Sequence, residues 1–92
     1  MSQKEVLITK MADKKIGTIT HFYDGIGVGI VKLDRKLKVG DKVRIQGSTT
    51  NFEQEISEIQ FEHESIPNGK KGQEVGVKVK EKVRDGDGIY LL

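Results

Sequence analysis

Four basic residues near the C-terminus are spaced two apart: Lys78, Lys80, Lys82 and Arg84. Alternate residues of an extended segment point to the same side, so these side chains would form one positive stripe. Such a stripe can follow the phosphates of a nucleic acid. A merely solvated strand face has the same pattern, and both interpretations stand at this point.

An aromatic cluster forms the second candidate site, because His21, Phe22 and Tyr23 stand between two predicted strands. Connections between strands lie on the surface, where rings can stack on a base or contact a protein partner. The same rings can also fold back and close the end of a barrel. We group these three residues with the basic stripe as a predicted nucleic-acid-binding site.

The remaining polar motifs do not predict catalysis or a cofactor. Three glycines alternate in the segment 25–29, as in a dinucleotide-binding turn, but that turn needs a helix after it and a strand pattern follows here. His63 stands between Glu62 and Glu64. Neighbours on a strand point to opposite sides, so these three cannot converge on a metal ion. We therefore expect no metal, no cofactor and no enzymatic activity.

Length and composition restrict the architecture that carries these groups. A chain of 92 residues has room for one domain, which excludes a two-domain enzyme or a nucleotide-hydrolysing one. Charged residues make up 33% of the chain but nearly cancel to a net charge of +2, which argues against a disordered tail. There is no cysteine for a disulfide or a thiolate metal site. The apolar run Val6–Ile8 is too short for a signal peptide or a membrane span, so we expect a cytoplasmic protein.

Alternation of apolar and polar residues dominates the sequence and predicts strands. We expect six of them, separated by turns at the spacing of a sandwich or barrel. Their ranges are Lys15–His21, Ile26–Lys32, Lys42–Gln46, Phe52–Glu62, Glu74–Lys80 and Gly88–Leu91. The apolar positions change parity in the fourth strand, and a β-bulge near Ser57 and Glu58 would reconcile its two halves.

Charge is distributed unevenly along these strands. Residues 48–64 hold acidic side chains and no basic one. Lys42 and Arg44 point outward on the strand before them. If the two strands pair as a hairpin, ion pairs will form across them.

Three segments repeat one turn pattern. Residues 37–45 and 83–91 each contain a glycine, then an aspartate, then apolar residues two apart, and residues 71–77 hold a weaker copy with glutamine. The glycine supplies the positive φ that the turn requires, and the polar side chain can bond to the backbone ahead of the next strand. We expect equivalent turns that lead into strands of one barrel.

Taken together, these elements resemble the second domain of translational GTPases such as elongation factor Tu and initiation factor two. The resemblance covers Lys15 to Leu92 and rests on the Gly25-x-Gly27 turn, the segment 37–45, Ile59-x-Phe61, the segment 72–77 and Val83-x-x-Gly86-Asp87-x-Ile89. It implies an all-β fold, a closed six-stranded Greek-key barrel without exposed sheet edges. Ile26 stands where the larger factors often carry a basic residue. Similar barrels also end certain collagenase-type peptidases.

The resemblance implies a non-enzymatic binding domain. In the family this barrel contacts transfer or ribosomal RNA beside a GTPase domain that has no counterpart in this sequence. We therefore expect contact with RNA, the ribosome or a translation-related protein. The alternative is a protein-interaction barrel that partners a separately encoded enzyme or GTPase. We assign residues 15–92 to the barrel and residues 1–14 to an N-terminal extension or edge strand, and we leave the oligomeric state open.

Overall fold

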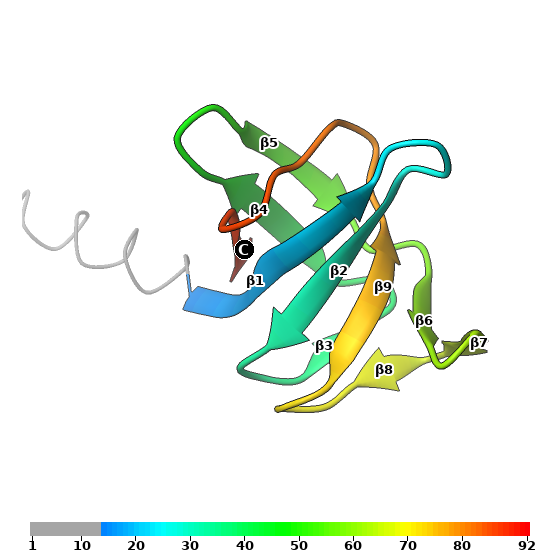
Figure 1. The fold of residues 1–92 in the computed structure, drawn as a ribbon. Coiled ribbons are helices and arrows are strands. Elements are labelled where there is room, and N and C mark those ends of the chain that lie inside the picture. Colours follow the sequence, from blue (N-terminus) through cyan, green and yellow to red (C-terminus); the bar gives the residue numbers. More distant parts are fainter. Residues whose placement is uncertain (1–13) are drawn as a thin grey trace, which may run out of the picture.

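A computed structural model describes residues 14–92 of the chain as a fold built from strands, with no helix among these residues (Figure 1). The strands are β1 (Lys14–Tyr23), β2 (Val28–Leu33), β3 (Leu37–Lys38), β4 (Lys42–Gln46), β5 (Asn51–Glu55), β6 (Ile59–Phe61), β7 (Glu64–Ile66), β8 (Asn68–Gly69), β9 (Glu74–Lys78) and β10 (Gly88–Leu91). The predicted all-β class is confirmed. The predicted extension over residues 1–14 falls almost entirely outside the described residues, so that boundary stays a prediction.

Eight strands form one antiparallel sheet in the order β5-β4-β10-β1-β2-β9-β6-β7, and β3 pairs with β8. The sheet curls, so that β1, β2 and β9 lie in front of β4 and β5 in Figure 1. Its hydrogen-bonded order ends at β5 and at β7. The predicted closed six-stranded barrel is therefore not what the structure forms.

A side chain, rather than a strand ladder, joins the edge strand β5 to the far side of the curl. The Gln54 amide donates to the Lys78 carbonyl oxygen at 2.8 Å, and its own oxygen accepts from the Lys80 backbone nitrogen at 2.9 Å. One amide thus serves both a main-chain acceptor and a main-chain donor that a neighbouring strand would otherwise satisfy. This contact holds the curled sheet together without closing it.

Two predicted strands are shorter than the alternation indicated. The predicted strand Phe52–Glu62 is divided into β5 and β6 rather than bulged, because the backbone of Ile56 turns to bond the loop before β4. Its nitrogen donates to the Asp41 oxygen at 2.8 Å, and its oxygen accepts from Gly40 at 2.8 Å. The predicted strand Glu74–Lys80 ends at Lys78. Val79 still donates to the Gly27 oxygen at 3.0 Å, but the Gly27 nitrogen donates to Tyr23 at 2.9 Å in the turn, so the ladder stops there.

The hydrophobic core lies on the inner side of the curled sheet. Alternate residues of each main strand face it, including Val31 and Leu33 of β2, Val75 and Val77 of β9, and Ile45 of β4. Side chains from strands distant in the sequence therefore meet in one cluster, whose burial supplies the main stabilising free energy of the fold.

The repeated turn pattern is confirmed at all three positions. Gly40, Gly72 and Gly86 have φ values of 98°, 91° and 91°. Each is followed by a polar side chain that accepts from the backbone nitrogen three residues before it: Asp41 from Lys38 at 2.9 Å, Gln73 from Lys70 at 2.8 Å and Asp87 from Arg84 at 2.9 Å. Positive φ and a local side-chain acceptor make the three turns equivalent.

The predicted hairpin of a basic strand and an acidic one is also present. In the β4–β5 pair, Lys42 lies opposite Glu55 and Arg44 opposite Glu53. The Arg44 guanidinium and the Glu53 carboxylate form an ion pair of 3.0 Å.

No helix in the described part of the chain is long and apolar enough to span a membrane. A cytoplasmic location stays a prediction.

Candidate functional site

The outer face of the strands β1, β2, β9 and β6 carries an unusual row of residues. His21 lies opposite Ile30, Ile30 opposite Gly76, and Gly76 opposite Gln60. Because neighbours in register point to the same side of a sheet, the four residues cross its outer surface in one line. A second line beside it begins with Tyr23 opposite Val28.

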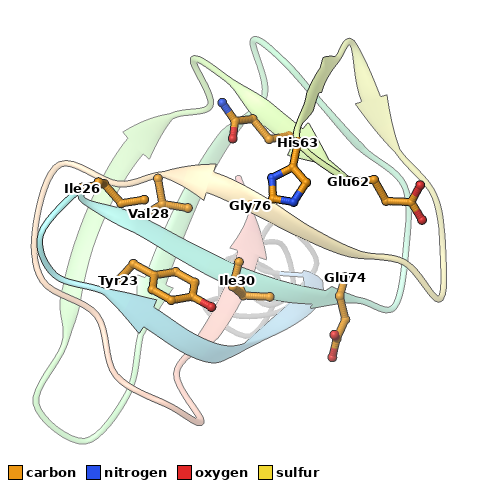
Figure 2. A pocket seen from close by; sticks show the side chains of 9 residues that line it. Tyr23, Ile26, Val28, Ile30, Glu62, His63, Glu74 and Gly76 are labelled. Carbon is orange, nitrogen blue, oxygen red and sulfur yellow. The ribbon is translucent and has the colours of Figure 1, made fainter.

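Gly76 makes this surface concave. A Cβ atom at position 76 would lie 3.2 Å from Val28 Cγ1 and 3.8 Å from Ile30 Cδ1. The glycine therefore leaves a hollow that its apolar neighbours wall on one side. The resulting groove has a volume of about 430 Å³ and is lined by Tyr23, Ile26, Val28, Ile30, Gln60, Glu62, His63, Glu74 and Gly76 (Figure 2).

Two exposed apolar side chains form one rim of the groove. Tyr23 is 49% exposed and Ile26 is 63% exposed, and both line the same groove, so their exposed apolar surfaces belong to one patch. The turn between β1 and β2 presents Ile26, because the backbone nitrogens of Ile26 and Gly27 both donate to the Tyr23 oxygen, at 3.3 and 2.9 Å. The Tyr23 ring packs edge-on against His21, with centroids 4.5 Å apart. That contact orients the ring beside the groove.

The turn between β6 and β7 forms the opposite rim. Glu62 and His63 have φ values of 52° and 70° and connect Phe61 to Glu64, its partner in the hairpin. Two consecutive positive φ values define a tight hairpin turn that normally carries Asn-Gly. Each such residue other than glycine costs about 1 kcal/mol or more. Figure 2 shows the His63 ring over the strand that carries Gly76. The strained turn thus places the side chains of Glu62 and His63 at the groove.

The charged residues of the groove are acidic. Glu62 and Glu74 belong to the lining and no lysine or arginine does. Their carboxylates lie toward one end of the groove, away from Ile26 and Val28 (Figure 2). Lys32 of β2 lies opposite Glu74 of β9, and its positive charge offsets part of this negative charge. The groove therefore combines an apolar end with an acidic one.

Gln60 is held in the groove by a carboxylate behind it. Its amide donates to Glu58 Oε2 at 2.8 Å, and the Ser65 hydroxyl donates to the same oxygen at 3.1 Å. These hydrogen bonds, first from Gln60 and then from Ser65, lower the pKa of Glu58 below its ordinary value. Glu58 thus stays ionised and fixes the side chain of Gln60.

The predicted basic stripe does not form one strand face. Lys78 ends β9, while Lys80, Lys82 and Arg84 lie in the connection that leads to β10, and all four side chains are exposed. The buried residues Val79 and Val83 hold this connection against the core. The four cations are therefore exposed but do not lie along a straight extended segment.

The predicted aromatic cluster is divided between the two faces of β1. The structure extends β1 to Tyr23, so the three residues belong to a strand rather than to a connection. Phe22 packs against the core, and His21 and Tyr23 lie on the outer face. Only Tyr23 lines the groove. Alternation along a strand explains this division.

The sequence interpretation missed the groove because alternation does not say which face of a strand is inside. Ile26, Val28 and Ile30 alternate with glycines, and Gly29 is the residue that faces inward. A Cβ at position 29 would lie 3.2 Å from Ile19 Cδ1 and 3.3 Å from Val83 Cγ2. Val31 and Leu33 stand two and four positions after Gly29 and so point to the same side of β2. They are the signal that could have identified the inner face.

Residues 14–92 contain no group of three side chains able to hold a metal ion.

Comparison with known proteins identifies relatives outside translation. No protein-family model matches the sequence. The chain is 39% identical over 79 residues to an uncharacterised protease of Methanocaldococcus jannaschii, which covers 85% of this chain and 19% of the protease. It is 32% identical over 77 residues to a collagenase of Porphyromonas gingivalis, which covers 82% of this chain and 21% of the collagenase. The chain thus spans about a fifth of the length of these relatives.

Two solved structures have the same fold. The fold matches the C-terminal domain of a Geobacillus thermoleovorans protein described as a U32 peptidase, with a TM-score of 0.81, 22% identity and coverage of 86% of this chain and 92% of that chain. A selenomethionine variant of the same domain matches with a TM-score of 0.80 and 22% identity, over 84% of this chain and 98% of that chain. The predicted membership among second domains of translational GTPases is therefore wrong, and so is the translation-related, RNA-binding function inferred from it. Shared turn glycines and core valines had indicated a fold but not a function.

Proposed function

We propose that this chain is a non-catalytic protein-binding domain that works with the catalytic part of a U32-type peptidase. The similarity to proteases over most of this chain, but over only about a fifth of their length, supports an accessory role. The remaining part of such proteins is then the part that hydrolyses peptide bonds. This proposal agrees with the alternative drawn from the sequence, a protein-interaction domain that partners an enzyme. It replaces the main interpretation, a translation-related domain that contacts RNA.

The groove across Gly76 is the observation that carries this proposal. Tyr23 and Ile26 expose large apolar surfaces beside one another on a rim, and Val28 and Ile30 continue this surface into the hollow. An exposed apolar surface with a polar border is typical of a protein-interaction site. Glu62 and Glu74 would repel the phosphates of a nucleic acid from it. A polypeptide therefore fits the groove better than RNA does.

A replacement experiment in the Porphyromonas gingivalis collagenase tests the proposed function. The matched 77-residue segment is deleted, and this chain is inserted in its place or added as a separate protein. We expect the deletion to weaken collagen cleavage and this chain to restore at least part of it. The chain alone should cleave neither collagen nor casein.

Two variants make this experiment specific for the groove. Ile26→Ser removes an exposed apolar side chain from the rim, and Val39→Ser removes a similarly exposed one elsewhere. Restoration should be lost with Ile26→Ser and retained with Val39→Ser. Peptide cleavage by the chain alone, or equal restoration by both variants, would contradict the proposal.

A further inference from the structure

We infer that the groove binds an extended polypeptide segment in which a large apolar residue is followed, two positions later, by lysine or arginine. This inference rests on the proposed protein-binding function and adds the chemistry of the bound segment. It follows from the apolar hollow at Gly76 and from the acidic residues at one end of the groove.

The apolar residue of the segment fits the hollow above Gly76. Gly76 adds no side chain to the lining, and Val28 and Ile30 wall the groove beside it on one side. The Tyr23 ring points toward Ile30 in Figure 2 and adds an aromatic wall. A volume of about 430 Å³ lies within the range of small ligand sites, so one large side chain and its backbone can enter.

Strand geometry gives the spacing of the basic residue. Glu74 lies two residues from Gly76 on β9, so both face outward and stand about 7 Å apart along the strand. An extended segment that runs along β9 has the same repeat, and its residues i and i+2 face the sheet together. In a segment that runs antiparallel to β9, an apolar residue at Gly76 therefore places the residue two positions later at Glu74, because Glu74 precedes Gly76 on β9.

Charge complementarity selects a basic residue for that position. Glu62 and Glu74 supply two carboxylates at the same end of the groove (Figure 2), while Lys32 beside Glu74 supplies one ammonium group. Together these three groups leave a net negative charge at this end of the groove. A lysine or arginine of the bound segment neutralises it, and the guanidinium of arginine can bond to a carboxylate through two donors.

Fluorescence anisotropy with labelled peptides tests the inference. The probe is Gly-Gly-Leu-Ser-Arg-Gly-Gly, and the comparison peptides replace Leu by Ser, replace Arg by Glu, or place Arg directly after Leu. We expect the probe to bind about tenfold more tightly than each comparison peptide, with an affinity that falls as salt rises. Equal binding of all four peptides, or no binding of the probe, would overturn the inference.

Variants of the chain locate the binding. The double variant Glu62→Gln and Glu74→Gln should weaken probe binding about fivefold or more, with little effect on the peptide in which Glu replaces Arg. The matched control, Glu55→Gln with Glu81→Gln, removes two exposed carboxylates outside the groove and should change nothing. An equal loss in both double variants would overturn the assignment to the groove.

Two further outcomes separate this inference from its alternatives. Sedimentation velocity that shows a dimer abolished by Ile26→Ser would assign the groove to a second copy of the chain and overturn the peptide inference. Probe binding together with failed replacement in the collagenase would support the inference and contradict the proposed function. Successful replacement without selective probe binding would contradict the inference alone.

Discussion

Ile30 of β2 lies directly opposite Gly76 of β9, and the missing side chain at position 76 turns their shared outer surface into a hollow. The pair faces away from the core, to which the neighbouring residues Val31 and Val75 contribute. The same two strands therefore build the core on one side and a binding surface on the other. Small changes on the outer side should affect binding without unfolding the protein.

Gly76→Ala should reduce binding while leaving the fold intact. The new methyl group would lie 3.2 Å from Val28 Cγ1, a contact that requires a small shift of the valine. Alanine also restricts the unfolded chain, so the free energy of unfolding should change by less than about 1 kcal/mol. Urea titration measures the free energy of unfolding. Fluorescence anisotropy with the labelled peptide measures the binding affinity. Large destabilisation, or unchanged affinity, would contradict the proposed hollow.

The double variant Glu62→Asn and His63→Gly should stabilise the protein. Both positions have positive φ, which asparagine and glycine adopt at lower cost in this kind of hairpin turn. We expect the free energy of unfolding to rise by about 1 kcal/mol. Probe binding should weaken, because both replaced side chains line the groove. Lower stability in urea titration would show that Glu62 and His63 are retained for the turn rather than for the groove.

Gly47→Ala should be strongly destabilising. A Cβ atom at position 47 would overlap the carboxylate of Asp87, whose Cγ would lie only 2.7 Å away. Asp87 is buried and cannot move without losing its bond from the Arg84 nitrogen. We expect a loss of about 2–3 kcal/mol in thermal or urea unfolding. Gly25→Ala is the matched control, since open space surrounds that position. Similar stability of the two variants would contradict this packing.

Asp87→Ala should cost more stability than Asp41→Ala, although both residues make the same turn contact. Each carboxylate accepts from a backbone nitrogen three residues earlier at 2.9 Å. Asp87 is 3% exposed, so its loss also leaves a gap in the interior. We expect about 1–2 kcal/mol for Asp87→Ala and about 0.5–1 kcal/mol for Asp41→Ala. Asp87→Asn keeps an acceptor and should recover part of the loss. Equal costs for the two alanine variants would show that burial does not matter here.

Glu58 should make stability dependent on pH in the acidic range. Hydrogen bonds from Gln60 and Ser65 lower its pKa in the folded state. Its contribution is therefore fully present above the ordinary glutamate pKa and is lost as the pH falls through the lowered value. NMR titration of the Glu58 carboxyl carbon should show a pKa that rises toward normal in Gln60→Ala, and by less in Ser65→Ala. An unchanged pKa in both variants would refute the assigned cause.

Local sequence was sufficient to predict the repeated turns. Gly40, Gly72 and Gly86 adopt positive φ because the residues beside them form a turn on their own, with a side-chain acceptor within reach. The alternating pattern likewise predicted the all-β class, since period two alone separates the faces of a strand. The charge contrast between neighbouring strands suggested that ion pairs would form if they paired, and the β4–β5 hairpin has one.

The groove could not be predicted in this way, because it depends on pairing between distant strands. Ile30, Gln60 and Gly76 become neighbours only when β2, β9 and β6 assemble. Alternation also does not say which face of β2 is inside. Gly29 faces inward because Ile19 and Val83 fill the space that its side chain would need. The division of Phe52–Glu62 into two strands depends in the same way on bonds between Ile56 and the loop at Gly40 and Asp41.

An NMR titration of the ¹⁵N-labelled chain with the peptide Gly-Gly-Leu-Ser-Arg-Gly-Gly tests the central claim most directly. Binding in the groove predicts that the largest amide shifts cluster at Tyr23, Ile30, His63 and Gly76, which surround the hollow (Figure 2). The claim is contradicted if the shifts cluster instead in the 79–87 connection or on the β4–β5 hairpin, or if saturating peptide leaves the groove amides unchanged.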